Sequence, residues 1–75
     1  MRIRLKLMGV LKARTPAGGA LEVADGATIE DVLRHLAIAP QRIKVFTVNG
    51  VFERDPGRSL AADDELTVIP PVGGG

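Results

Sequence analysis

The sequence predicts an α+β fold in which a β-sheet packs on one helix in two layers, and three patterns support this. Apolar and basic residues alternate from Met1 to Leu7, which is typical of a strand with one buried face. Between residues 29 and 36, apolar residues recur at the spacing of a single helix face. Residues 43–69 then contain further β-rich runs separated by turn signals. The apolar stripe of the helix and the apolar face of the strands can bury each other.

The N-terminal third of the chain predicts an antiparallel hairpin. Ile3, Leu5 and Leu7 form the apolar face of its first strand. The segment 15–19, Thr-Pro-Ala-Gly-Gly, is typical of a turn because proline and paired glycines interrupt regular structure. A second short alternating run over residues 21–23 supplies the return strand.

The helix is expected over about residues 29–37. Its apolar stripe is made of residues spaced i, i+3, i+4 and i+7, namely Ile29, Val32, Leu33 and Leu36. Thr28 is a suitable N-cap, and Glu30 and Asp31 place negative charge where the helix dipole favours it. Pro40 is expected to end the helix, because the residue before a proline is pushed out of helical geometry.

The remaining strands are expected at residues 43–48, 51–54 and 65–69. Asn49-Gly50 predicts the tight turn between the first two, and we expect a turn to explain this pair fully. Pro70-Pro71 should stop regular pairing after the last strand, because neither residue can donate a ladder hydrogen bond. The element order is therefore β-β-α-β-β-β, with a mixed sheet of four to five strands.

Composition limits the function classes. The chain has 75 residues, 45% of them hydrophobic, which is enough for one core but not for two domains. The absence of cysteine removes disulfides and thiolate metal sites. A net charge of +1 and only two aromatic residues argue against nucleic-acid binding. No apolar run is long enough for a membrane span or a secretory signal, so we expect a cytoplasmic protein.

Few side chains could perform catalysis. His35 is the only histidine, and a solvated position off the apolar stripe is its expected place, since no second ligand could complete a metal site. The nine acidic residues show no pair spaced for acid–base chemistry. Arg2, Arg4 and Lys6 form a basic strand face that could steer an acidic partner, although a simply solvated face is the more ordinary interpretation. A self-contained enzyme is therefore nearly excluded.

The C-terminal sequence Ile-Pro-Pro-Val-Gly-Gly-Gly, residues 69–75, is the most specific feature of the chain. Glycine lacks a Cβ atom, so such a tail can pass through a narrow channel and leaves its carboxylate open to attack. Together with the element order, Val48-Asn49-Gly50 and the acidic turn at residues 63–65, this tail resembles the ThiS/MoaD family of sulfur carriers. Gly73, where the family usually has a small non-glycine residue, and Asp64, where glycine is common, depart from the family pattern.

The resemblance implies a ubiquitin-like β-grasp domain over residues 1–72 and a flexible glycine tail over residues 73–75. It also implies that a partner similar to ubiquitin-activating enzymes adenylates the Gly75 carboxylate, using ATP and Mg²⁺ that the carrier itself does not bind. A sulfur donor would then displace AMP to leave a thiocarboxylate on Gly75, next to Gly74. A second partner, a sulfur-accepting synthase subunit, would receive the sulfur, so the chain would be a carrier and not an enzyme.

A docking surface is expected near the tail. Met8 breaks the alternation of the first strand, and Ile69 has the corresponding position on the last strand. In a β-grasp sheet these two strands are parallel neighbours, so the two side chains could form one small exposed apolar patch. The residues expected to bind partners are the patch and the segment that leads to the diglycine: Met8, Ile69, Pro70, Pro71, Val72 and Gly73.

Two other functions share the same features. A protein modifier would be joined to lysines through Gly75, as ubiquitin is, whereas a passive interaction domain would carry a glycine tail without a function. Within the carrier family, Pro70-Pro71-Val72 resembles the molybdopterin-synthase small subunit. The short segment 39–42 resembles thiamine-type carriers. The molybdopterin branch is slightly favoured.

Overall fold

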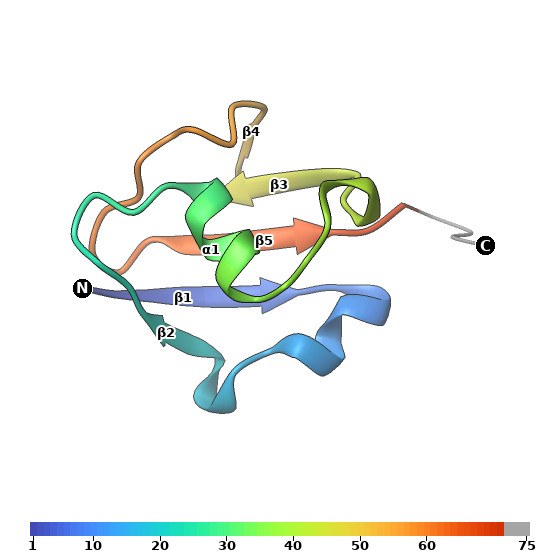
Figure 1. Cartoon of the computed structure of the whole chain (residues 1–75), viewed down its shortest axis with the longest axis horizontal. Helices are drawn as coiled ribbons and strands as arrows, with labels where there is room; N and C mark the ends of the chain where they lie inside the picture. The colour runs from blue at the N-terminus through green and yellow to red at the C-terminus, as the bar shows by residue number, and fades with distance from the viewer. Residues whose placement is uncertain (72–75) are drawn as a thin grey trace.

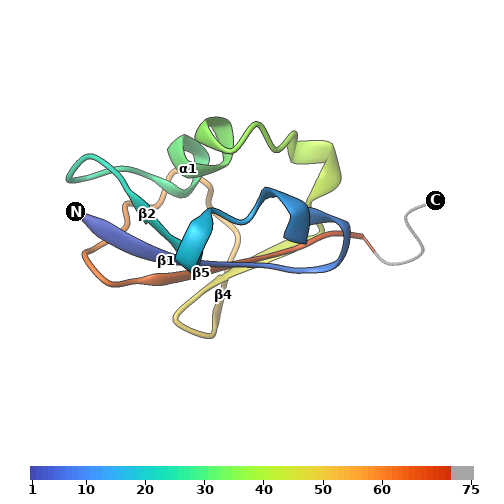
Figure 2. The same cartoon turned by 90° about the horizontal axis from the view of Figure 1, so that it is seen from below.

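The structure, a computed structural model, describes residues 1–71 and consists of one five-stranded sheet with its helical segments on one face (Figure 1, Figure 2). One short α-helix, α1, spans Ile29–His35. The strands are β1 (Arg2–Leu7), β2 (Ala20–Glu22), β3 (Val45–Val48), β4 (Val51–Glu53) and β5 (Glu65–Ile69). Three short 3₁₀ segments connect them, namely η1 (Gly9–Arg14), η2 (Ala17–Gly19) and η3 (Pro40–Arg42).

The strand order is β2-β1-β5-β3-β4, so the last strand of the chain lies in the middle of the sheet. β5 runs parallel to β1 and antiparallel to β3, while the β1–β2 and β3–β4 pairs are antiparallel hairpins. The predicted mixed sheet packed on one helix is therefore confirmed, and its topology is that of the β-grasp fold. As Figure 1 shows, β1 and β5 point toward the same end of the molecule, which is also the end where β5 leaves the sheet.

The core lies between the sheet and α1. The inward side chains of β1 alternate with exposed ones as the sequence predicts. Leu66 and Val68 of β5 are fully buried opposite the helix stripe. The buried cluster joins both layers and comprises Ile3, Leu5, Leu7, Leu11, Ile29, Val32, Leu33, Ile38, Val48, Leu60, Leu66 and Val68.

The first turn of α1 is anchored by its own cap and by the loop after β4. The Thr28 hydroxyl accepts a hydrogen bond from the Asp31 amide, and the Asp31 carboxylate accepts one from the Thr28 amide. This capping box lowers the pKa of Asp31, the backbone hydrogen bond being the largest cause. The amides of Ile29 and Glu30 donate to carbonyl groups of the 54–60 loop. Amides that a helix N-terminus leaves unpaired are thereby satisfied.

The helix ends earlier than predicted, and Pro40 does not end it. Leu36 is the C-cap, and Ala37 adopts a left-handed conformation with φ 58°. The amide of Ala37 donates to the Arg34 carbonyl, and the amide of Ile38 donates to the Leu33 carbonyl, both at 3.0 Å. These two bonds form a Schellman motif, in which glycine is the usual left-handed residue. Because residue 37 is alanine and not glycine, the sequence did not indicate this helix end.

Asn49 does more than form the predicted turn. Asn49 and Gly50 have φ values of 53° and 83°, as a tight hairpin requires. The Asn49 side chain also donates to the Asp64 carboxylate and accepts from the Glu65 amide, each at 2.9 Å. Asp64 in addition accepts from the Ala61 amide, and this bond is the largest cause that lowers the pKa of Asp64. The expectation that a turn alone explains Asn49 was therefore wrong, because its side chain fastens the start of β5.

Smaller differences concern element bounds. β3 begins two residues later than expected, and the segment between the first two strands folds into η1 and η2 instead of a simple turn. No helix within residues 1–71 is long and apolar enough to cross a bilayer. The expected boundary between the domain and its tail, at residues 72 and 73, lies outside the described part of the chain.

Candidate functional site

The candidate site is the end of the sheet where β5 leads toward the C-terminus. Two backbone hydrogen bonds hold β5 there from both sides. The Met8 amide donates to the Val68 carbonyl at 3.0 Å, and the Lys44 amide donates to the Ile69 carbonyl at 2.8 Å. Pairing stops at Pro70, as the sequence predicts, so the chain leaves from a strand that is fixed up to its last residue.

Gly9 makes a close approach to the start of this exit. It follows β1 in a left-handed conformation with φ +55°. A Cβ atom built at Gly9 would lie 3.0 Å from Cγ of Pro70. Any side chain at position 9 would therefore press on Pro70 as well as strain the backbone. Gly9 and Pro70 together fix where the chain leaves the sheet.

Met8, Val45, Ile69 and Pro70, which we call the exit patch, surround this point. Val45 is the register partner of Ile69 on β3. Met8 follows the pair Leu7–Val68, so it lies beside Ile69 on the β1 side. The structure thus brings Met8 and Ile69 together as predicted. All four side chains are half-buried, so Met8 and Ile69 are less exposed than expected, and partner binding at this patch stays a prediction.

The most exposed large apolar side chains of residues 1–71 were not predicted from the sequence. Phe52 is 71% exposed and is paired with Thr47, which places it on the same sheet face as Val45. Val10, in η1 immediately after Gly9, is 78% exposed. The signal for Phe52 was available, since the Asn49-Gly50 turn sets the register and hence the face. Nothing in the local pattern predicted Val10, because the 3₁₀ turn that exposes it has no clear periodicity.

The outer face, meaning the sheet face opposite α1, is apolar near the exit and basic toward β2. Arg2, Arg4 and Lys6 are exposed along β1. Arg2 forms an ion pair with Glu22 at 3.3 Å, and Arg4 stands in register with Glu65. Figure 2 shows that the helical segments lie on the other side of the sheet and leave this face uncovered. The face can therefore meet a partner that combines apolar contacts with acidic groups.

The described residues offer no catalytic constellation of their own. His35 is exposed at the end of α1. Within residues 1–71, no group of three or more potential ligand side chains could hold a metal ion. Pro71 is exposed at the end of the described chain. Val72, Gly73, Gly74 and Gly75, which the sequence analysis assigned to partner binding and sulfur transfer, lie outside the described residues.

The comparison with known families shows to which protein family the chain belongs. The sequence profile of the ThiS family matches residues 5–75, which includes the end of β1, strands β2 to β5 and the three glycines. The chain belongs to the ThiS family. A search of curated proteins returned no match.

Solved structures place this ThiS family member beside ubiquitin-like modifiers. It is 26% identical to SAMP1 from Haloferax volcanii, with a TM-score of 0.70 and complete coverage of both chains. A second crystal structure, of H. volcanii small archaeal modifier protein 1, is 25% identical with a TM-score of 0.70, over 95% of this chain and 98% of that one. The chain is thus a small ubiquitin-like β-grasp protein.

Proposed function

We propose that this protein is a sulfur carrier whose terminal Gly75 carboxylate is activated and converted to a thiocarboxylate. The observation that carries the proposal is the match to the ThiS family through residue 75. In the sequence, the diglycine comes shortly after β5, a central strand of the sheet, and glycine lacks a Cβ atom that could obstruct attack on the terminal carboxylate. In this proposal, residues 1–71 position the start of the tail and provide the surface that the partner enzymes recognise.

The reaction requires two partner proteins and a sulfur donor. An E1-like enzyme with ATP and Mg²⁺ catalyses attack of the Gly75 carboxylate on the α-phosphate, which releases pyrophosphate and leaves an acyl adenylate. The sulfur donor supplies sulfide, which attacks the acyl carbon; AMP departs with the carboxylate oxygen that joined it to the chain, and a thiocarboxylate remains on Gly75. A synthase subunit finally accepts it. Because the described residues offer no acid–base or metal site, we assign all catalytic groups to these partners.

The exit patch supports docking of both partners. Tight binding is usually concentrated in a few apolar side chains near the centre of an interface. The exit patch adjoins the point where the tail begins, so docking there would direct the tail toward the partner's active site. The uncovered outer face extends this contact to Phe52.

The mass of the protein isolated from its native host tests the carrier function. Replacement of one oxygen by sulfur adds about 16 mass units, the same nominal gain as oxidation of Met1 or Met8 to the sulfoxide. Alkylation with iodoacetamide separates the two, since only the thioacid reacts as a thiol. We expect an alkylated C-terminal peptide that is lost when Gly75 is deleted. If the protein also forms no adenylate with ATP and the host's E1-like enzyme, the carrier proposal is wrong.

Docking is tested with two substitutions on one hairpin. Phe52 and Val51 are 71% and 68% exposed but face opposite sides of the sheet. We expect F52D to weaken binding to the E1-like enzyme by about tenfold or more, as loss of an interface anchor does. V51D should leave binding unchanged, because it introduces the same charge on the other face. Equal effects of the two variants would refute docking through the outer face.

A second candidate function is protein modification through Gly75. The similarity to small archaeal modifier protein 1 favours it specifically. Arg58 is the last basic residue of the chain, so trypsin would leave residues 59–75 attached to a modified lysine. Mass spectrometry of host lysate should therefore search for this long branched peptide and not for a diglycine remnant. The presence of this peptide would establish protein modification. If the peptide is absent and the Gly75 thiocarboxylate is found, only the carrier function is supported.

We propose that the sulfur is used in molybdopterin synthesis, because Pro70-Pro71-Val72, which precedes the glycines, resembles the molybdopterin-synthase small subunit. Thiamine thiazole synthesis is the alternative. The thiocarboxylated protein should transfer sulfur when mixed with the host's molybdopterin-synthase large subunit and precursor. Transfer only in the thiazole-forming reaction would reverse this assignment. If deletion of Gly74-Gly75 affects neither reaction, the chain is a passive domain.

A further inference from the structure

The inner face of the sheet, which carries α1, is not fully covered by it. α1 has seven residues and is therefore about 10 Å long. Five strands spaced about 4.8 Å apart span roughly 19 Å. The inner face of β3 is only partly covered, since Val48 there is buried but Phe46 is not fully buried. Phe46 and Ile43, which pack against the core, are accordingly half-buried.

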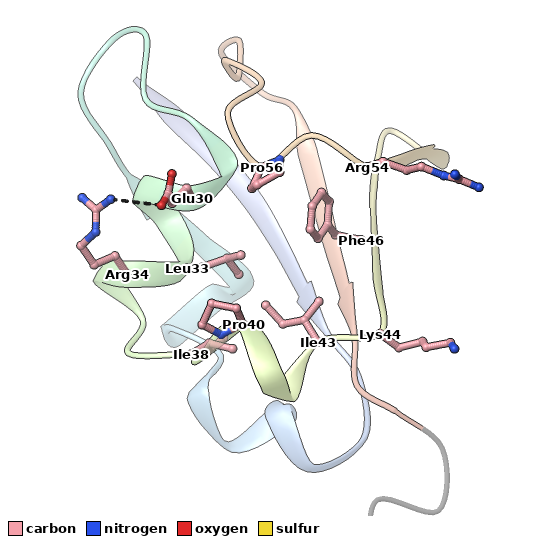
Figure 3. A pocket seen from close by; sticks show the side chains of 10 residues that line it. All are labelled: Glu30, Leu33, Arg34, Ile38, Pro40, Ile43, Lys44, Phe46, Arg54 and Pro56. Carbon is pink, nitrogen blue, oxygen red and sulfur yellow. Dashed lines mark ion pairs between the residues drawn. The ribbon is translucent and has the colours of Figure 1, made fainter.

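The uncovered strip forms a groove of about 380 Å³ between the helix layer and β3. This volume is within the range of ordinary ligand sites, roughly 300–1,000 Å³. Figure 3 shows Leu33 and Ile38 on the helix side facing Ile43 and Phe46 on the strand side. Two prolines, Pro40 and Pro56, complete the apolar part of the lining, and neither has an amide N–H to donate. The groove opens on the inner face, whereas Val45 and Ile69 of the exit patch belong to the outer face; the two sites adjoin at Lys44, whose amide donates to the Ile69 carbonyl.

The charges at the groove are mainly basic. Arg34 on α1 is engaged, with Glu30 at 3.8 Å and Asp31 at 3.4 Å. Lys44 and Arg54 on the strand side are exposed and form no ion pair with any residue of 1–71. In Figure 3 both extend from the strand side toward solvent, away from α1. The middle of an occupant would therefore meet apolar side chains, and its flank would meet two uncompensated positive charges.

We propose that this groove binds a short peptide segment of a partner protein, with adjacent bulky apolar side chains followed by carboxylates. The apolar lining takes the bulky side chains, and Lys44 and Arg54 attract the acidic flank. We choose a peptide as the occupant because one extended chain can place apolar side chains in the groove and carboxylates near Lys44 and Arg54 at the same time. This site goes beyond the proposed sulfur-carrier function and does not depend on it. It allows a second protein to bind while the outer face is occupied.

The proposal can be tested by NMR titration of the full chain with one defined probe, acetyl-Leu-Leu-Ile-Asp-Glu-Asp-amide. We expect chemical-shift changes at the amides of Leu33, Ile38, Ile43 and Phe46, with the outer face unaffected. A peptide with serine in place of Leu and Ile should not bind. A peptide with lysine in place of Asp and Glu should bind at least tenfold more weakly. Shifts confined to the outer face, or equal binding of the three peptides, would overturn the proposal.

Charge-reversal variants separate the groove from general charge effects. K44E/R54E should raise the dissociation constant of the acidic probe by about tenfold at low salt, the sum of two exposed charge interactions. K6E/K12E changes the net charge equally at exposed positions outside the groove, and it should leave the dissociation constant within about twofold. An equal loss of binding in both double variants would show a nonspecific charge effect and would refute the site. All variants must retain the dispersed spectrum of the folded chain.

Discussion

Replacing Ala37 by glycine should stabilise the protein, because Ala37 occupies the left-handed position of the Schellman motif that ends α1. An L-residue in this conformation costs about 1–2 kcal/mol relative to the right-handed one. Glycine removes that cost but loses more backbone entropy on folding, about 0.5–1 kcal/mol. Ala37 is exposed, so no packing is lost with its methyl group. The expected net gain in the free energy of unfolding for A37G is about 0.5–1 kcal/mol.

Urea unfolding followed by far-UV circular dichroism is the appropriate assay, because the chain has no tryptophan or tyrosine for fluorescence. In a domain of this size the gain corresponds to a rise in Tm of roughly 2–8 °C. A39G is the matched control, since Ala39 is also exposed but has an ordinary extended backbone with φ −72° and ψ 142°. It should lower stability by about 0.5–1 kcal/mol through unfolded-state entropy alone.

The comparison of the two variants decides the argument. If A37G is no more stable than the unmodified chain while A39G is destabilised as expected, the left-handed conformation at residue 37 stores no strain. The same outcome would follow if the helix continued through residue 37 in solution. In that case glycine would act as an ordinary helix-interior substitution and destabilise the chain by about 1 kcal/mol.

Three further predictions concern the sheet and the exit. G9A should cost about 1–2 kcal/mol by urea unfolding, since the left-handed backbone and the contact with Pro70 both oppose a side chain. Asp64 is held by backbone and side-chain hydrogen bonds that lower its pKa, so its stabilisation is present above the unfolded pKa of this carboxyl and is lost as pH falls through the lower folded value. D64N should therefore reduce stability at neutral pH and flatten the acid limb of a pH–stability profile. L66A, at a fully buried position of β5, should cost about 2–5 kcal/mol, and a smaller loss would indicate that the core can collapse around the cavity.

Sequence patterns predicted most of the fold because the two layers are strongly amphipathic. The alternation in β1 is uninterrupted, and the structure buries Ile3, Leu5 and Leu7 as that pattern requires. The stripe beginning at Ile29 likewise predicted the buried side of α1. Such patterns identify the face that meets the core, and that information determines the fold class for a chain with one helix.

The helix end and the surroundings of the exit could not be predicted in the same way. The end of α1 depends on the positive φ of Ala37, a conformation that an alanine in the sequence does not indicate. Pro40 instead suggested a helix end too far along the chain. Met8 and Ile69 were correctly expected to lie together, but the partial burial of Ile69 involves β3, whose Val45 stands in register with it. The exposure of these side chains is set by the register between strands that are distant in the sequence, and local sequence patterns do not determine that register. The groove likewise results from the shortness of α1 relative to the sheet.

The central position of β5 has a consequence for synthesis of the chain. The β1–β2 and β3–β4 hairpins can each form from neighbouring residues, but only β5 joins them. A growing polypeptide that lacks residues 65–69 therefore has two separate hairpins and an incomplete core. Strands joined by distant contacts assemble late, after the intervening loop has been closed. The domain consequently folds only after translation has reached its last strand, so a partner that recognises the folded sheet encounters only molecules already made as far as Ile69.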